Sequence, residues 1–526
     1  MKTDTTIRRV DWEKFSLMII VMTCVLAYAN SFSGVFLYDD IIRIDAYTQI
    51  RHAWHSMLNS TRPLVGLSIY FNYLYGGLNP TSYHAVNLVI HCIAGLLLFG
   101  IVRCTLRLPG LVERYGRSSS GLALTVATVW VVHPLQTESV TYIIQRAESL
   151  MGLFYLLTLY CVLRGVQSQS PHRWYTAAIA ACALGMATKP VMVTAPVMVL
   201  LYDRFFISTS AANALRTRWS LYVGLAATWL ILVALLSVPN ESSASAGFNA
   251  GIASPVAYLL TQPGVVLHYL KLAVWPRSLC LDYAWSPAST PAEILMPSVF
   301  VLALIFVSLF ASVHRHPFGF AGLWFFIILA PSSSIVPVAD YAAEHRMYLP
   351  LAGVIVLLVM VVHNLFTVIF NNAANYHVNL NRVSIAVSVM AVAILLLATI
   401  QRNRVYSSAE TMWRDVIAKR PHNLRAQLGI GAFLLGRGEH DGAEAYFKKI
   451  LTHVPEISES TPAHHLTVYA MTHNNLGVIR YREGKYSAAA THFREAIRVV
   501  PQLKDARKNL KNAIQKLSSE IGSQVP

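Results

Sequence analysis

The sequence predicts an all-α protein in two parts: a polytopic bundle of membrane helices over residues 1–400 and a short helical-repeat solenoid over residues 401–526. Three observations predict this division. The chain of 526 residues is 55% hydrophobic and 13% charged, with a mean hydropathy of +0.47, which excludes an ordinary water-soluble globular protein. Its long apolar runs stop near residue 400, and two later segments repeat each other without gaps.

Eleven apolar runs are expected to cross the membrane, although several fall short of the roughly 20 residues that a spanning helix needs. With the N-terminus in the cytoplasm, every cytoplasmic segment contains Lys or Arg, as the positive-inside rule requires. The odd number then places the repeats outside the cytoplasm, together with the first loop. The runs lie near residues 15–37, 85–102, 119–133, 146–163, 174–188, 190–207, 219–238, 295–313, 318–331, 347–370 and 383–400.

Two segments allow a second interpretation. Arg8 and Arg9 precede a short apolar run in which Ala27 and Ala29 have the spacing of a signal-peptide cleavage site. The many later runs favour a retained first helix instead. Residues 256–275 are long enough to span but contain a proline, a histidine and a lysine. A full crossing would move every later loop to the other side, so we expect an interfacial or re-entrant helix there.

The net charge of +16 does not indicate nucleic acid binding. In the first part the arginines lie in short loops between apolar runs, as membrane topology demands. In the second part the basic residues are spread along helices, where they form a solvated face or attract anionic lipid headgroups. The six cysteines form no CxxC pair and none lies in the repeats, so neither a disulfide framework nor a zinc site is expected.

The repeated segments of the second part are residues 430–455 and 476–501. Their spacing is that of the tetratricopeptide repeat, in which small residues let two helices touch and a proline ends the second helix. The stacked repeats have either a purely structural role or form a docking surface for a protein partner. The matched positions are Gly431, Ala443, Phe447 and Pro455 in the first copy and Gly477, Ala489, Phe493 and Pro501 in the second.

Two adjacent carboxylates, Asp39 and Asp40, follow the first apolar run in the stretch "SGVFLYDDIIRIDAY". A charge so close to the headgroup region is costly unless it is used. The carboxylates could be a solvated end to the helix. They could also accept a proton from an attacking hydroxyl or hold a divalent metal, Mg²⁺ or Mn²⁺. Asp45 is expected to be solvated.

Further polar residues fall in loops on the same predicted side of the membrane. Arg146 is suited to a phosphate, since its guanidinium offers two parallel N–H donors, but a buried structural ion network would also explain it. Lys189 either snorkels to the headgroups or, with Arg346, contacts an anion. Together the loops suggest a pocket for an anionic lipid-linked substrate. Its residues are His133, Glu138, Arg146, Glu148, Lys189, Glu344, His345, Arg346 and Tyr348.

Several common catalytic motifs are missing. The sequence contains no GxxxxGK[ST], HExxH, GxSxG or GxGxxG pattern, which disfavours nucleotide-driven transport and serine or zinc hydrolysis.

Five segments, in this order and followed by the repeats, resemble the transmembrane and tetratricopeptide-repeat O-mannosyltransferases and their bacterial relatives. The likeness covers nearly the whole chain. The chain departs from the family in "TKP", which replaces a commoner Lys-Glu pairing and leaves the partner of Lys189 open. The segments are "RPLVGLSIYFNYLYGGLNPTSYHAVNLVIH", "HPLQTESVTYIIQRAESL", "MATKPVMVTAPVMVLLYD", "WPRSLCLDY" and "EHRMYLPLAG".

The resemblance implies a GT-C membrane glycosyltransferase that takes a sugar from a polyprenyl phosphate and inverts its anomeric centre. It implies that Asp39 and Asp40 belong to the active site and that the other loop residues contact donor or acceptor. The short repeat array resembles that of a bacterial protein, which favours undecaprenyl phosphate over dolichol and a bacterial inner membrane.

We therefore expect transfer of a hexose such as mannose to a hydroxyl, Ser or Thr of an exported protein, outside the cytoplasm. The acceptor protein would be presented by the repeats. The alternatives are glycosylation of a glycan or lipid, and a non-enzymatic transporter or assembly scaffold whose repeats recruit partners.

Overall fold

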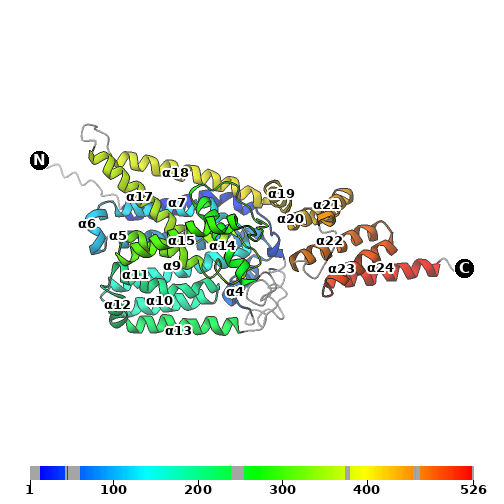
Figure 1. Cartoon of the computed structure of the whole chain (residues 1–526), viewed down its shortest axis with the longest axis horizontal. Coiled ribbons are helices and arrows are strands. Elements are labelled where there is room, and N and C mark those ends of the chain that lie inside the picture. The colour runs from blue at the N-terminus through cyan, green and yellow to red at the C-terminus, as the bar shows by residue number, and fades with distance from the viewer. Residues whose placement is uncertain are drawn as a thin grey trace.

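The computed structural model describes residues 12–41, 44, 60–237, 254–372, 380–453, 457 and 463–523. Figure 1 shows a bundle of long helices that run roughly side by side, with a smaller group of helices extending from one end. The predicted all-α class is confirmed. Arg8, Arg9 and Asp45, which the sequence-based interpretation used, lie outside the described residues.

Seven helices in the described residues are long and apolar enough to cross a membrane, which identifies an integral membrane protein. Each overlaps one of the eleven predicted runs. They are α1 (Trp12–Tyr28) with η1 (Ala29–Ser33), α5 (Pro80–Leu106), α9 (Arg146–Val166) preceded by η3 (Ile143–Gln145), α13 (Trp219–Leu236), α15 (Pro291–Val313), α17 (Pro350–Asn372) and α18 (Leu380–Asn403), which continues into η7 (Arg404–Ser407).

The other four predicted runs are helical but shorter or bent. One of them consists of η4 (Pro190–Thr194) and α11 (Ala195–Phe206), and it meets α12 (Ala211–Thr217) at an angle of 108°. It counts as an eighth span only if the bent pair is taken as one. The remaining three are α7 (Ser119–Val131), α10 (Pro171–Met186) and α16 (Pro317–Leu329).

The core of the bundle lies between α1, α5, α7 and α9. Ile20 and Cys24 of α1 and Trp130 of α7 are fully buried there. A Cβ atom on Gly95 of α5 would come within 2.4 Å of the Val131 side chain, so glycine is what lets α5 and α7 approach closely. By contrast, α15 exposes most of its apolar side chains, as a helix that faces lipid should.

Short helices connect the spans at the end of the bundle where the repeats begin. Some start with a proline, such as Pro63 and Pro134, which is pre-organised for the first turn of a helix because its fixed φ suits that turn and its missing N–H would have no partner there. Residues 255–274 form one continuous helix, α14, which is not among the seven span candidates. Its position relative to a membrane stays a prediction. The other connecting helices are α4 (Pro63–Gly76), η2 (Pro134–Gln136), α8 (Thr137–Val140) and η6 (Glu344–Met347).

The predicted repeats are confirmed as helical pairs. A Cβ atom on Gly431 would meet the Phe447 ring at 2.5 Å, and one on Gly477 would meet the Phe493 ring at 2.6 Å, so both glycines allow the same close contact. The first pair is α20 (Leu424–Gly436) and α21 (His440–His453), and the second is α22 (Ala463–Arg482) and α23 (Tyr486–Val499). They are flanked by α19 (Ala409–Lys419) and α24 (Lys504–Ser523).

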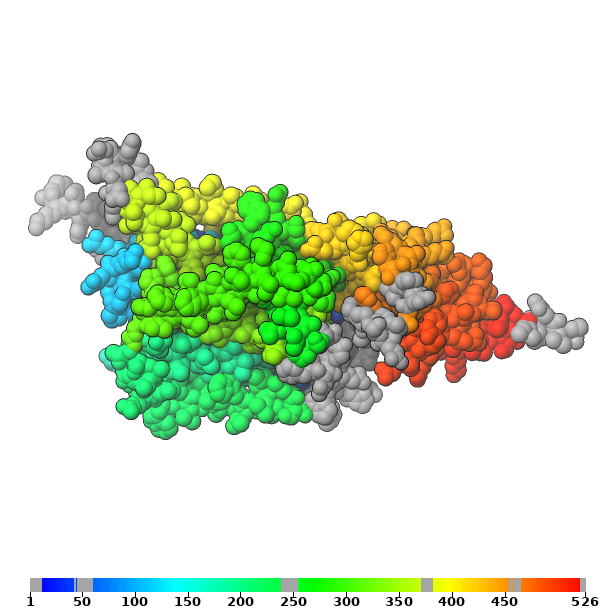
Figure 2. Space-filling model, viewed as in Figure 1, coloured from blue at the N-terminus to red at the C-terminus, as the bar shows by residue number. Residues whose placement is uncertain are grey.

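The repeats meet the bundle at the end that carries the first loop. The Tyr38 ring, which follows α1 in the chain, packs edge-on against the Trp413 ring of α19 at 5.4 Å. Figure 2 shows the repeat helices, coloured orange to red, extending away from this junction. The first loop and the repeats therefore lie at the same end of the molecule. The side of the membrane on which that end lies stays a prediction.

Candidate active site

Asp40 is buried and holds the first loop against the bundle. Its side chain is 1% exposed. One carboxylate oxygen accepts a hydrogen bond from the Leu37 backbone N–H at 3.0 Å, and the other accepts from the Ile144 N–H at 2.8 Å. Burial raises the pKa of Asp40 to about 7, although both hydrogen bonds oppose that shift. These contacts indicate a structural role for Asp40, because they join the first loop to the segment around Ile144.

Asp39 is placed differently, since it is only half-buried. Its backbone N–H donates a hydrogen bond to the Tyr142 hydroxyl at 3.0 Å. The residue before it, Tyr38, has a φ of 41°, a left-handed conformation that costs energy for a bulky residue. This turn separates the two acids, so that Asp40 faces the protein interior. Of the two residues, Asp39 is the more exposed.

The two acids do not fit a shared metal ion. Both Asp40 oxygens already accept backbone N–H donors, and a cation beside those N–H groups would meet like charge. Among the described residues there is no cluster of three His, Cys, Asp or Glu side chains arranged to hold a metal.

Arg146 is fully buried at the start of α9, and its donors point to protein acceptors. Its Nε donates to the Asn87 side-chain oxygen at 2.6 Å, one Nη donates to the Ser68 carbonyl at 3.2 Å and the other to the Tyr83 carbonyl at 3.0 Å. This geometry favours the structural network over the anion site that the sequence also allowed. The positive charge still acts on Asp40.

Glu138 and His345 form a buried pair that joins two loops. Glu138 accepts from both the backbone N–H of His345, at 2.9 Å, and its Nδ1, at 2.7 Å. Burial raises the pKa of Glu138 to about 7 and lowers that of His345 well below its usual value. His133 caps η2 by accepting from the Leu135 N–H, and its Nε2 faces the Ala273 carbonyl at 3.2 Å. His133 thus stabilises the loop that presents Glu138.

Lys189 has a partner that the sequence did not reveal. Its ammonium pairs with the carboxylate of Glu148, 41 positions earlier, and neither side chain is more than 12% exposed. The sequence motif "TKP" has no glutamate beside Lys189. The structure supplies one from a distant segment, because α9 brings Glu148 to the start of η4. The charge of Lys189 is therefore largely balanced.

Glu344 and Tyr348 lie in the interior beside η6. Glu344 accepts hydrogen bonds from the Tyr283 hydroxyl at 2.6 Å and from the Cys280 N–H, and Arg402 of α18 lies 3.9 Å from its other oxygen. Tyr348 is fully buried, and its hydroxyl lies 2.9 Å from Nδ1 of His91. Both residues hold the loop between α16 and α17 in place.

Arg346, like Arg146, donates only to neutral acceptors. Its guanidinium donates to the carbonyls of Ser332 and Tyr341, each at 3.1 Å, to the Asp340 carbonyl and to the Tyr258 hydroxyl. Neutral acceptors leave a net positive field at this position. Asp340 contributes a nearby carboxylate, but that side chain is 48% exposed and pairs with Arg425.

The predicted residues thus come together at one end of the bundle in two groups. Asp39, Asp40 and Arg146 form the first group, and the loops around Glu138, Lys189 and Arg346 form the second. The Tyr142 hydroxyl accepts the hydrogen bond from the Asp39 N–H and so belongs to the first group.

Sequence reasoning missed several residues of this region. Asp282 lies within "WPRSLCLDY" and Asp340 shortly before "EHRMYLPLAG", whereas nothing distinguished the basic residues of α18 and α20 from a solvated helix face. The missed residues are Asn87, Tyr142, Asp282, Asp340, Arg402 and Arg425.

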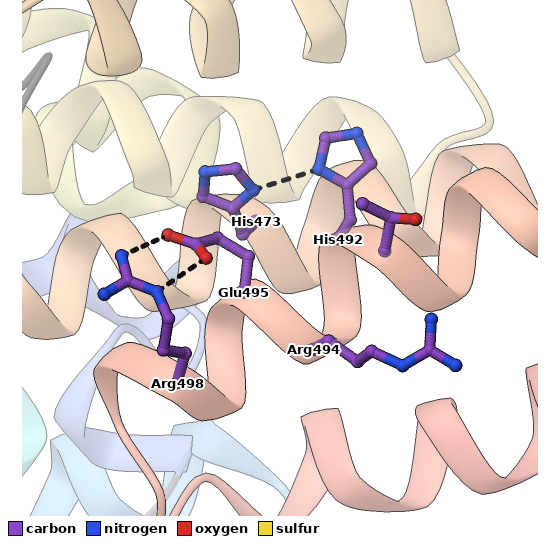
Figure 3. Close-up of a pocket in the computed structure, with 6 residues that line it drawn as sticks. His473, His492, Arg494, Glu495 and Arg498 are labelled. Atoms are coloured by element: carbon purple, nitrogen blue, oxygen red, sulfur yellow. Dashed lines mark hydrogen bonds and ion pairs between the residues drawn. The ribbon is translucent and has the colours of Figure 1, made fainter.

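A separate shallow hollow of about 450 Å³ lies on the second repeat. Figure 3 shows the His473 and His492 rings facing each other, 2.9 Å apart between their Nδ1 atoms, with Glu495 paired to Arg498 and Arg494 pointing away from the rings. Burial and the neighbouring His492 lower the pKa of His473 to about 4. This hollow belongs to the repeat surface rather than to the loops described above.

Comparisons with known proteins agree with this architecture. Residues 71–237 match a family described as dolichyl-phosphate-mannose-protein mannosyltransferase, and residues 400–457 match a tetratricopeptide-repeat family. The chain is similar to the human proteins named protein O-mannosyl-transferase TMTC1 and TMTC4. It is 24% identical to each, over 86% and 83% of its own length and 55% and 66% of theirs. Mouse TMTC3 is 23% identical over 96% of this chain and 58% of its own length.

The predicted resemblance to the transmembrane and tetratricopeptide-repeat O-mannosyltransferases is confirmed by these matches. The chain spans a little over half to about two thirds of the length of these relatives.

Proposed function

We propose that this relative of the transmembrane and tetratricopeptide-repeat O-mannosyltransferases is itself a membrane glycosyltransferase of the GT-C type. It transfers a hexose, mannose in the relatives' names, from a polyprenyl phosphate to a hydroxyl of Ser or Thr in an exported protein. The observation that carries the proposal is the pair of adjacent acids at the end of the bundle where the cationic loops meet: Asp40 is buried and anchors the first loop, and Asp39 beside it is half-buried.

In the proposed reaction the acceptor oxygen attacks C1 of the sugar on the face opposite the phosphate, with inversion. The new C1–O bond forms as the C1–O bond to phosphate breaks, and polyprenyl phosphate leaves with the bonding electrons. Asp39 accepts the hydroxyl proton as general base and later releases it to water. Asp40 and Tyr142 position Asp39 and do not exchange protons with substrate.

The leaving phosphate gains negative charge in the transition state. Arg346 supplies the positive field that offsets it, because its own hydrogen bonds go to neutral acceptors. Lys189 contributes less, since Glu148 balances its charge. Fixed cations count for more in such a site than in water, because little solvent screens them there.

The acceptor protein and the carrier lipid belong to the same proposal. The repeats begin at the end of the bundle that holds Asp39, so an acceptor bound to them lies close to that carboxylate. The proposal places the enzyme in a bacterial inner membrane, with undecaprenyl rather than dolichyl phosphate as carrier and with the site facing away from the cytoplasm.

The test is transfer by the purified full chain from radiolabelled polyprenyl-phosphate mannose to Ser/Thr peptides. Wild-type protein should label the peptide, and Asp39→Asn should lower kcat by about 10²- to 10⁴-fold, the usual contribution of a general base. The matched control is Asp441→Asn, an exposed aspartate on α21, which should retain full activity. Full activity in Asp39→Asn would remove the catalytic assignment, and an inactive wild type would favour a transporter or scaffold.

A further inference from the structure

The helices α19 and α20, at the start of the repeats, contact the loops that surround the candidate site. Arg425 of α20 lies at the centre of this contact. Its Nη1 pairs with the Asp282 carboxylate at 2.9 Å and with the Asp340 carboxylate at 3.1 Å, and its guanidinium lies 6.0 Å from the centre of the Tyr38 ring. One side chain of the repeats therefore contacts three loops of the bundle that are far apart in the sequence.

Other contacts hold the loop around Asp282 at the same place. Asn423 donates to the Asp282 carbonyl at 3.1 Å, and Lys419 donates to the Leu279 carbonyl at 2.6 Å. The loop needs such support, because Ser278 and Ala284 have φ values of 59° and 42°. Residues other than glycine in this conformation persist when their surroundings fix them.

The contact continues to the proposed base. The Tyr38 ring packs against Trp413 of α19 on the repeat side, and the next residue, Asp39, is anchored through its N–H to Tyr142 on the bundle side. Tyr38 holds a φ of 41° between these two supports. The direction of the Asp39 carboxylate therefore depends on where α19 and α20 sit.

The arrangement differs from an ordinary surface salt bridge. An exposed ion pair is weak, because water screens it and two flexible side chains must be ordered. Arg425 instead bridges two carboxylates from separate loops with a side chain that is 28% exposed, so its guanidinium fixes a geometry. Arg437, at the end of the same helix, is 57% exposed and pairs only with repeat residues among those described.

We propose that Arg425 is a positioning residue and that α19 and α20 form part of the catalytic unit, in addition to any acceptor binding by the later repeats. This inference rests on the proposed function. We call the contacts of Arg425 with Asp282, Asp340 and the Tyr38 ring the Arg425 clamp. Without this clamp, the three loops relax, and Asp39 loses its alignment with the acceptor hydroxyl. A carboxylate misplaced by about 1 Å can lower the rate of the reaction by about 100-fold, while the affinity for the substrates stays unchanged.

The experiment compares Arg425→Ala, Arg425→Lys and the control Arg437→Ala in the purified full chain. A short Ser/Thr peptide serves as acceptor, too short to bridge from the distal repeats to the site. We expect Arg425→Ala to lower kcat about 10- to 100-fold with an unchanged KM for donor and peptide, as misalignment predicts. Arg425→Lys should recover part of the loss, because it keeps the positive charge but not the planar guanidinium that lies by the Tyr38 ring. Arg437→Ala should match the wild type.

Hydrogen–deuterium exchange of residues 37–41 and 279–284 gives a second readout that needs no activity. Exchange should rise in Arg425→Ala and stay unchanged in Arg437→Ala, because the clamp orders these segments. A wild type that transfers no sugar would remove the proposed function, and the exchange result would still judge the clamp. The inference is overturned if kcat and exchange in Arg425→Ala match the control, or if only the KM for long protein acceptors rises.

Discussion

Replacing Asp40 by alanine separates its structural role from catalysis by its neighbour. In the native protein the Asp40 carboxylate accepts the backbone N–H groups of Leu37 and Ile144, and all of these groups are buried. Alanine leaves both donors without an acceptor. A buried donor without a partner costs about 1–3 kcal/mol, so Asp40→Ala should lower the free energy of unfolding by about 2–6 kcal/mol. Asp39→Asn should cost little by comparison, because Asp39 is half-buried and is anchored through its backbone.

The assay is thermal unfolding of the purified protein in detergent, measured together with sugar transfer. We expect a clearly lower unfolding midpoint for Asp40→Ala, whereas Asp39→Asn should keep a near-native midpoint and lose activity. Asp441→Ala, on the exposed face of α21, is the control for removal of an aspartate. The reasoning is refuted if Asp40→Ala unfolds at the temperature of the control, or if Asp39→Asn is the less stable of the two.

Two further predictions concern pH and the repeats. Burial raises the pKa of Asp40 from 3.8 to about 7, so its contribution to stability is fully present below pH 3.8 and is lost as pH rises through about 7. The unfolding midpoint of wild type relative to Asp40→Asn should therefore fall across that window, and a flat difference would contradict the assignment. In the repeats, a Cβ atom on Gly477 would overlap the Phe493 ring, so Gly477→Ala should destabilise the protein by about 1–3 kcal/mol. Chemical denaturation measures this loss. Gly436→Ala is the control and should change stability little, because its Cβ would meet no atom within 4 Å.

Local patterns were enough to predict much of the fold. The apolar runs predicted helices, and each of the eleven is helical, although only seven in the described residues have the length and hydropathy of a span. The shortfall has a physical reason. A helix surrounded by other helices, such as α7, needs neither the length nor the continuous apolar surface of a helix that faces lipid on its own.

The candidate site was predicted only in outline. The pairing of Asp39 with Asp40 and the polar loops were visible as motifs, but their partners were not. Lys189 finds Glu148 because two helices bring together residues 41 positions apart, and no spacing rule anticipates this contact. For Arg146 the sequence allowed two roles, and the packing of its donors against Asn87 and backbone carbonyls favours the structural one.

The sequence by itself determined the helical class, the places where the chain turns polar and the repeated helix pairs, because each depends on periodicity within one segment. Tertiary structure alone decided which of two adjacent acids is buried, and that Arg425 of the repeats pairs with Asp282 and Asp340 in two loops of the bundle. The physical reason is that a carboxylate's role follows from its solvation and from the donors around it. Those donors come from segments that only the folded chain brings together.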